Sequence, residues 1–440
     1  MKIKFILLFL CLFIFSCSSK KVLVPHFEVT SGISRELKTP GFWISKTQNP
    51  DKIILTEKQI ENLNAKILEN CPFLKNVLSR DLEKEKEKRS RINYANKLKK
   101  YSKYYDALSL KKVGSTFFET LKNNIDPDAP INIRFALTIG YAKLKALPTD
   151  VPLISSSDTT DLNRLAATDL NFWSPVAALY STKDNQWCYV ISEVYEGWIK
   201  AEHLLFASKE VISDYFNDKN IAVVTSRFAD IYKDTSLTQF YDSVKMGTIL
   251  HISKIKNDTI EVKIPVKSLN ENLEFMYCYV KKSDVSLGFL PYTKRNVIVQ
   301  AFKQIDAPYD WGHNYGYTDC SGFVKQIFSC FGINFPKNSG QQINMKDSIQ
   351  LGNYNTTLKA QAIISEGISG ITLLYLPGHI MLYLGHLDQN PYVIHSIRGY
   401  SGKNNKIHML NKVAVTDLAL GDKSKDKSLL ERITLMNVVK

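Results

Sequence analysis

Residues 309–328 read YDWGHNYGYTDCSGFVKQIF, and they place Cys320 where an aromatic-rich loop meets a helical pattern. From Ser321 onward, apolar residues recur at helical spacing until Gly332, which is a typical C-terminal stop. Unpaired N–H groups and the dipole at a helix N-terminus favour the thiolate, which is the nucleophilic form of cysteine. The stretch therefore predicts a reachable, reactive cysteine at the start of a helix whose apolar face consists of Phe323, Val324, Ile327, Phe328 and Phe331.

Two histidines follow in a predicted β-hairpin. Residues 379–384 alternate in the manner of a half-buried strand, residues 392–395 form a second short strand, and turn-forming residues lie between them. The midpoint of His379 and His395 falls inside this turn, so we expect the two side chains to oppose each other directly. Opposed side chains on one face have Cβ atoms roughly 4.5–5.5 Å apart. His395 could thus orient the ring of His379, as the third member of a nucleophile, base and orienter set does.

Spacing alone also permits a purely structural interpretation. A single cysteine at a helix start is more often a small buried residue than a nucleophile, and a strand histidine is more often a satisfied core or edge residue. The catalytic hypothesis therefore needs support from more of the sequence.

That support comes from three blocks that occur in order. Residues 309–328, FPKNSGQQ at 335–342 and LPGHIMLYLGHLDQNPYVIHS at 376–396 resemble the NlpC/P60 family of papain-like cell-wall cysteine peptidases. The resemblance extends over residues 295–400. It implies cleavage of peptidoglycan stem peptides or muropeptides, commonly at the amide between γ-D-glutamate and a diamino acid such as meso-diaminopimelate.

The resemblance also implies residue roles by position. Cys320 matches the nucleophile, His379 the general base and His395 the polar third residue. Tyr309 matches a tyrosine that is thought to hold the oxyanion together with the backbone N–H of Cys320.

Four further positions match substrate-binding residues of the family. Asp319 and Ser321 match residues that bind the α-amino group in members that cut stems with a free N-terminal L-alanine. Trp311 and Ser339 match positions of the substrate pocket. The structural alternatives are helix capping for Asp319 and a turn hydroxyl for Ser339.

The N-terminal residues resemble a lipoprotein signal peptide over residues 1–16. Lys2 and Lys4 precede an apolar run at 5–15, and Cys17 would be the lipidated first residue of the mature chain. We expect an exported protein that is lipid-anchored to a membrane and faces the periplasm or cell wall. The alternative is a simple secretory peptide in which Cys17 is incidental. No segment after the first twenty residues is apolar enough to span a membrane.

The order of segments resembles multidomain lipoproteins of the same family and implies a multidomain α+β fold. Thr56 and Gln59 match a capping box that starts a helix. The Gly197-Trp198 pair is typical of a bacterial SH3-like barrel, and weaker strand patterns after residue 209 suggest a second copy. The predicted domains are a helical N-terminal clip domain at 17–125, SH3-like β-barrels at 126–208 and 209–290, and a papain-like α+β catalytic domain at 291–440.

Composition places few further limits on function. The formal net charge of +14 fits an anionic setting such as cell wall or phospholipid, but lysines scattered over solvated faces explain it equally well. No basic patch interleaved with aromatics argues for nucleic acid. Four cysteines have no expected role and no metal-binding spacing, and the sequence does not fix their pairing: Cys71, Cys188, Cys278 and Cys330. We expect a monomer that needs neither a metal nor another cofactor.

The sequence thus predicts a cysteine endopeptidase of murein turnover or recycling. One alternative from another class is a non-catalytic scaffold that binds the cell wall through its SH3-like modules. Another is an amidase, transglutaminase-like or acyltransferase reaction at the same Cys/His site.

Overall fold

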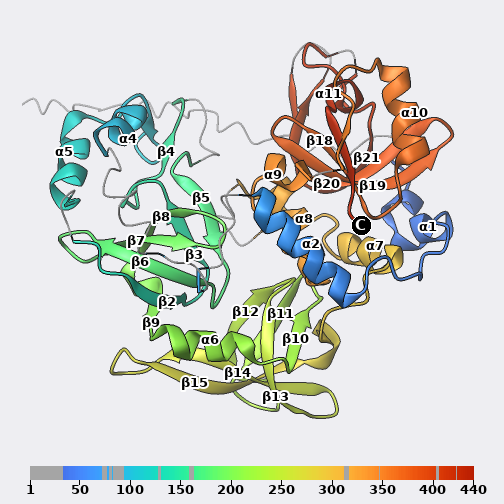
Figure 1. The fold of residues 1–440 in the computed structure, drawn as a ribbon. Helices are drawn as coiled ribbons and strands as arrows, with labels where there is room; N and C mark the ends of the chain where they lie inside the picture. Colours follow the sequence, from blue (N-terminus) through green and yellow to red (C-terminus); the bar gives the residue numbers. More distant parts are fainter. Residues whose placement is uncertain are drawn as a thin grey trace, which may run out of the picture.

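The structure is a computed structural model that describes residues 33–71, 77–78, 82, 94–126, 130–157, 163–311, 317–345, 347–402, 406–422 and 424–440. The fold is mixed α+β, with two seven-stranded sheets, one six-stranded sheet and a small two-stranded sheet (Figure 1). The predicted signal segment 1–16 and the predicted lipidation site Cys17 lie outside the described residues. Among the described helices, none is long and apolar enough to cross a membrane.

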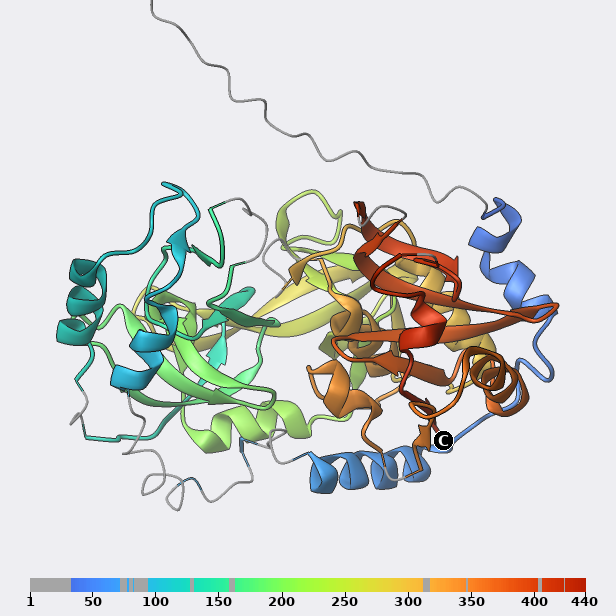
Figure 2. The same cartoon turned by 90° about the horizontal axis from the view of Figure 1, so that it is seen from above.

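The N-terminal helices are divided between two parts of the molecule. The short η1 (Glu36–Lys38), α1 (Pro40–Ser45) and α2 (Glu57–Asn70) contribute buried side chains to the core of the C-terminal unit. Figure 2 shows α1 and α2 on two different sides of that unit. By contrast, α4 (Tyr94–Tyr101) and α5 (Ser115–Asn124) pack into a separate apolar cluster beside the first seven-stranded sheet.

The predicted capping box at the start of α2 is confirmed. The Thr56 side chain accepts a hydrogen bond from the backbone N–H of Gln59, and the Gln59 side chain accepts one from the backbone N–H of Thr56. Ile60 and Ile67 of α2 are buried against the C-terminal unit. The capping box therefore determines where α2 begins, and the apolar face of the helix determines how α2 packs on the C-terminal unit.

Trp43 is the main anchor of α1. Its side chain is fully buried, its indole N–H donates to the carbonyl oxygen of Leu37 at 2.8 Å, and its ring centre lies 5.4 Å from that of Tyr392. We expect Trp43→Ala to lower the free energy of unfolding by about 3–5 kcal/mol, because it removes a large buried ring. Urea unfolding measures this, with Phe240→Ala as the control because Phe240 is 57% exposed. A loss below about 1 kcal/mol for Trp43→Ala would show that α1 is not an integral part of the core.

Each seven-stranded sheet is antiparallel and open. The first sheet contains β2 (Arg134–Thr138), β3 (Ala142–Lys145), β5 (Ala166–Leu170), β6 (Pro175–Ser181), β7 (Trp187–Ser192), β8 (Glu196–Lys200) and β9 (Leu204–Phe206). The small sheet pairs β1 (Tyr105–Asp106) with β4 (Leu153–Ile154). After α6 (Lys209–Asn217), the second sheet contains β10 (Ile221–Val224), β11 (Phe228–Tyr232), β12 (Phe240–Lys245), β13 (Ile249–Ile255), β14 (Thr259–Lys267), β15 (Leu273–Lys281) and β16 (Val285–Leu287).

The two large sheets have the same strand order. It is β5-β3-β8-β7-β6-β2-β9 in the first and β12-β11-β15-β14-β13-β10-β16 in the second, so corresponding strands occupy corresponding places. Two sheets of the same topology therefore follow each other along the chain. Among the described pairings, however, the two edge strands of each sheet do not pair with each other, and the predicted closed SH3-like barrels are not observed.

The C-terminal unit contains the six-stranded antiparallel sheet β17-β22-β18-β19-β20-β21. Its strands are β17 (Ile349–Gln350), β18 (Thr372–Leu376), β19 (His379–Leu387), β20 (Asn390–Ser401), β21 (Ile407–Asp417) and β22 (Leu435–Val438). Its helices are α7 (Lys294–Lys303), α8 (Cys320–Ser329), α9 (Ser339–Ile343), α10 (Thr356–Glu366) and α11 (Leu429–Arg432), and short η2 (Ala201–His203) and η3 (Lys282–Asp284) turns occur in the other two units.

Helix α8 packs against β19 and β20 and confirms the predicted apolar face. All five predicted side chains of that face are buried, and Gly332 follows with a φ of +75°. One expectation for the adjoining strand is wrong. Both faces of β19 are buried, because Ile380, Leu382 and Leu384 enter one core cluster while Met381 and Tyr383 enter another.

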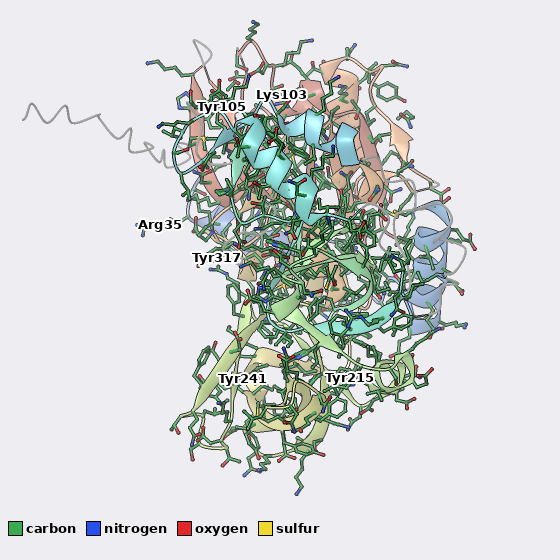
Figure 3. All side chains as sticks on the ribbon, turned by 90° about the vertical axis from the view of Figure 1, so that its left-hand side faces the viewer. Arg35, Lys103, Tyr105, Tyr215, Tyr241 and Tyr317 are labelled. Carbon is green, nitrogen blue, oxygen red and sulfur yellow. The ribbon has the colours of Figure 1, made fainter. Side chains whose placement is uncertain are left out.

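The second sheet unit docks directly on the C-terminal unit. The Arg227 guanidinium donates to the carbonyl oxygen of Ile305 at 2.8 Å, and the Lys303 ammonium donates to that of Thr225 at 2.9 Å. The ring of Tyr317 lies 6.0 Å from that of Phe228, and Figure 3 shows Tyr317 above the second sheet unit, which carries Tyr215 on α6 and Tyr241 on β12. The second sheet unit therefore contacts the C-terminal unit close to the start of α8.

Candidate active site

The turn that carries Cys320 is built around the carboxylate of Asp319. Asp319 is the N-cap of α8, and its Oδ1 accepts hydrogen bonds from the backbone N–H of Gly322 at 2.8 Å and from the Ser321 hydroxyl at 3.0 Å. Cys320 is the first residue of the helix and is 7% exposed. The capping alternative for Asp319 is thus present in the structure, and it also fixes the Ser321 side chain.

Two residues without a predicted role hold this turn. Lys337 lies just before α9, and Gln342 lies within it. The Lys337 ammonium lies 2.8 Å from both carboxylate oxygens of Asp319. The Gln342 side-chain amide donates to the carbonyl oxygens of Ser321 and Pro336, both at 2.8 Å. Both side chains are buried. They belong to the block at 335–342, but its pattern gave no reason to connect either side chain with the Asp319 turn.

The surroundings of the Cys320 thiol oppose its ionisation. Burial raises the pKa of the Cys320 thiol to about 12, and the Asp319 carboxylate acts in the same direction. The backbone N–H of Ile380, the Lys337 ammonium and the backbone N–H of Ser321 act the other way and lower that pKa. Backbone N–H groups at the helix start thus favour the thiolate, as expected, but desolvation of the buried sulfur outweighs them.

The predicted histidines form a hydrogen-bonded chain. His379 begins β19 and His395 lies in β20, and Nε2 of His379 is 2.7 Å from Nδ1 of His395. On the other side of the His395 ring, Nε2 is 3.1 Å from the hydroxyl of Thr416 on β21. His395 and Thr416 are buried, so each ring nitrogen of His395 has a partner away from solvent.

The register of this hairpin differs from the predicted one. Leu382 pairs with Ile394 and Tyr383 with Val393, and the strand carries a bulge before Gly385. Continued to the strand start, this register places His379 and His395 diagonally rather than opposite each other. Diagonal neighbours on one face are still within reach of long or aromatic side chains. The two rings therefore meet although the predicted direct opposition is wrong.

The chain of contacts is compatible with an arrangement of protons that leaves a base at His379. If Thr416 accepts from Nε2–H of His395, then Nδ1 of His395 is unprotonated and accepts from Nε2–H of His379. Nδ1 of His379 then carries a lone pair and can accept a proton. Burial lowers the pKa of His379 to about 4, with Arg432 acting in the same direction and Asp319 opposing it. The imidazole is accordingly a neutral base at physiological pH.

His379 and Cys320 are brought together by the packing of α8 on β19. The Cys320 sulfur lies 4.0 Å from the carbonyl oxygen of Gly378, and the backbone N–H of Ile380 faces the same sulfur. The residues on both sides of His379 thus contact the thiol. The residues predicted as nucleophile, base and base-orienting residue therefore lie close together in the fold.

The remaining residues that were predicted to bind the oxyanion or the substrate lie in different surroundings near Cys320 and His379. Burial raises the pKa of the partly buried Tyr309, and the negative charges of Asp319 and ionised Cys320 add to the shift, so its hydroxyl lies in the field of the nucleophile turn. Trp311 is 40% exposed in the approach loop. Ser339 is buried at the first position of α9, which contacts α8, β18 and β19.

The described cysteines are all free thiols, namely Cys71, Cys188, Cys278, Cys320 and Cys330, and all are buried. Within the part of the chain that the structure describes, no group of three or more His, Cys, Asp or Glu side chains could hold a metal ion.

Comparisons with known proteins connect the chain with one family. The model of the NlpC/P60 family matches residues 306–420. The chain is 24% identical over 269 residues to a protein named dipeptidyl-peptidase 6 from Lysinibacillus sphaericus, a match that covers 59% of this chain and 90% of that protein. It is 22% identical over 340 residues to a protein named gamma-D-glutamyl-L-lysine dipeptidyl-peptidase from Bacillus cereus, covering 68% of this chain and 91% of that protein.

A solved structure resembles nearly the whole chain. It is described as an NlpC/P60 endopeptidase from Photobacterium damselae subsp. piscicida, and the match has a TM-score of 0.72 at 17% identity. It covers 90% of this chain and 96% of that one. This likeness shows that the same overall fold occurs in that protein.

Proposed function

The chain belongs to the NlpC/P60 family through its C-terminal domain, and on this premise we propose that it is a cysteine endopeptidase that hydrolyses peptidoglycan stem peptides. The bond would be the amide between γ-D-glutamate and a diamino acid such as meso-diaminopimelate. The name of the Bacillus cereus relative, a gamma-D-glutamyl-L-lysine dipeptidyl-peptidase, supports this bond class.

The observation that carries the proposal is the chain from Thr416 through His395 to His379, which ends beside Cys320. A thiol with a raised pKa needs a base at the moment of attack, and a neutral imidazole with a fixed tautomer is such a base. A scaffold that only binds the cell wall would have no use for this buried arrangement.

In the proposed mechanism, Nδ1 of His379 takes the proton of the Cys320 thiol as the sulfur attacks the γ-D-glutamyl carbonyl carbon. The backbone N–H of Cys320 and the hydroxyl of Tyr309 bind the resulting oxyanion. The imidazolium then donates its proton to the leaving amine, and the C–N bond breaks. Water, deprotonated by His379, hydrolyses the thioester and restores the thiol.

We propose that the first sheet unit borders the substrate site. A cavity at its junction with the C-terminal unit is lined by Asp169 and Glu193 on one side and by Gly322, Lys325 and Lys337 on the other, next to the Cys320 turn, although the catalytic side chains themselves do not line it. We assign substrate contacts to Asp319, Ser321, Trp311 and Ser339, on the family pattern. A first sheet unit that borders the site favours short stems or stems with a free end, as in trimming or recycling of murein fragments.

The proposed cellular address follows from the substrate and the N-terminal sequence. Peptidoglycan lies outside the cytoplasm, and the segment 1–16 followed by Cys17 would export the chain and anchor it to a membrane by a lipid. We propose that it acts as a monomer, without a metal or organic cofactor.

Thr416→Val should lower kcat about tenfold and change KM little. Without the hydroxyl acceptor, a buried Nε2–H of His395 has no partner, which favours the tautomer with the proton on Nδ1. That proton would point at Nε2 of His379, so the single N–H proton of neutral His379 would move from Nε2 to Nδ1, where the base must be free. Steady-state kinetics on a stem tripeptide measure this, and Thr416→Ser should restore most of the rate. Unchanged kcat in Thr416→Val would refute the assigned tautomer chain.

Mass analysis of products from defined tri-, tetra- and cross-linked stems tests the proposed function. An endopeptidase releases a fragment with a new diamino-acid amino terminus. Stems that bind but stay intact would favour the scaffold. Loss of ammonia from an amidated stem, or a fragment joined to an added amine, would favour an amidase or acyltransferase at the same site.

A further inference from the structure

The carboxylate that shapes the nucleophile turn forms a salt bridge with a buried lysine. Asp319 and Lys337 are both more than nine-tenths buried, and the ammonium lies 2.8 Å from each carboxylate oxygen. Asp319 directly precedes Cys320 in the chain. A negative charge at this position disfavours a second negative charge on the adjacent sulfur. The cap that orders the turn is therefore, by itself, unfavourable for ionisation of the nucleophile.

The carboxylate has a structural task that explains its presence. It accepts hydrogen bonds from the Gly322 N–H and the Ser321 hydroxyl and so fixes the first turn of α8. Lys337 reaches it from the segment before α9, while Gln342 holds the Ser321 carbonyl from within that helix. A buried carboxylate without its partner would carry an uncompensated charge in a desolvated site, which strongly favours keeping the pair intact.

Other charged and titratable groups act on the same region. They include Asp169 on β5, Lys245 at the end of β12, Tyr309 and Asp310 in the approach loop, Lys325 on α8, His379 on β19, Glu193 after β7 and Arg432 on α11. Lys337 forms the salt bridge with Asp319, at 2.8 Å. It is the group placed to cancel the charge beside the thiol.

We propose that Lys337 is a positioning residue for the cleavage reaction, whose ammonium cancels the charge of Asp319 so that the turn can be held by a carboxylate without opposing ionisation of the Cys320 sulfur. This inference rests on the proposed function, since it concerns the nucleophile of that reaction. It assigns Lys337 no contact with substrate. The two charges act on the thiol in opposite directions, because Asp319 raises the pKa of Cys320 and Lys337 lowers it.

The test measures the reactivity of Cys320 without any substrate. Iodoacetamide alkylation is followed between pH 7 and pH 9.5 by mass spectrometry of the peptide that contains Cys320. We expect Lys337→Met to react about tenfold more slowly than wild type, Asp319→Asn faster, and the double variant within about threefold of wild type. Lys337→Arg keeps the charge and should react nearly as wild type. Lys359→Met is the matched control, because Lys359 is a buried lysine of the same unit whose ammonium is bonded to the Glu431 and Ile433 carbonyl oxygens.

The proposal is overturned if folded Lys337→Met reacts at the wild-type rate, or if the double variant is as slow as Lys337→Met. Should Lys337→Met fail to fold, Asp319→Asn must still react about tenfold faster than the double variant, and equal rates would overturn the proposal. Failure of the proposed function gives a different result. The wild type and the Lys337 and Asp319 variants then alkylate at the expected relative rates, but the wild type leaves every stem peptide intact.

Discussion

Cys320→Ala should abolish hydrolysis of peptidoglycan stem peptides, with kcat falling by about 10⁴-fold or more. The sulfur is the only atom in the proposed mechanism that bonds to the substrate, and the remaining oxyanion donors cannot replace a covalent step. Steady-state rates on a stem tripeptide measure the loss. Binding of the stem, followed by calorimetry, should persist because the alanine leaves the surrounding contacts in place.

Cys330→Ala provides the matched control for this loss. Cys330 is a fully buried thiol at the other end of the same helix, where its sulfur lies 3.6 Å from the carbonyl oxygen of Val224. Its replacement should cost some stability and leave the cleavage rate within about twofold of wild type. Equal activity losses in the two variants would mean that helix integrity, rather than the Cys320 sulfur, determines the rate.

His379→Gln should lower kcat by about 10³-fold, the second largest effect that we expect. The Cys320 thiol has a pKa of about 12 and therefore stays protonated at neutral pH unless a base takes its proton during attack. Glutamine can still hydrogen-bond to His395 but cannot accept that proton. Because burial lowers the pKa of His379 to about 4, wild-type activity should hold from neutral pH downward and decline as the pH falls through about 4.

His386→Gln is the control for the histidine substitution. His386 lies on the same strand as His379, is exposed, and contacts only the Tyr383 hydroxyl among the described hydrogen bonds, at 3.3 Å. Its replacement should not change kcat or the pH profile. A His379→Gln variant that retained the wild-type rate at pH 7 would refute the role of His379 as base.

The features that follow local rules were predictable from the sequence. The start of α2 depends on side chains three residues apart, and the buried face of α8 depends on apolar spacing within eleven residues, so both are encoded locally. The place of Cys320 at the helix start follows from the same local pattern. The strand patterns predicted two β-sheet modules, but they did not predict the form of each sheet. Strand patterns do not specify whether a sheet closes into a barrel.

The register of the β19–β20 hairpin depends on a distant part of the chain. Gly385 was expected to belong to the turn, but it lies within β19 with a φ of +135°, next to the bulge and in contact range of the Trp43 ring. A glycine tolerates this backbone conformation, and the indole that faces it comes from α1. No pattern within residues 379–395 contains that contact.

The residues that sequence reasoning missed support the site without belonging to its recognised pattern. Thr416 lies 21 residues after His395 on the neighbouring strand, and Lys337 lies 18 residues after Asp319. Each is an ordinary polar residue whose role appears only when its partner is known. A search for buried acceptors near His395 and buried cations near Asp319 would have required the tertiary structure.

Interception of the thioester by hydroxylamine tests the central claim most directly. A stem tripeptide with a γ-D-glutamyl–diamino acid bond is digested in the presence of hydroxylamine, and the products are identified by mass spectrometry. A γ-linked acyl-enzyme on Cys320 predicts a γ-D-glutamyl hydroxamate from wild type and from Cys330→Ala, and none from Cys320→Ala. Hydrolysis by wild type without any hydroxamate, or a hydroxamate formed by Cys320→Ala, would contradict the account.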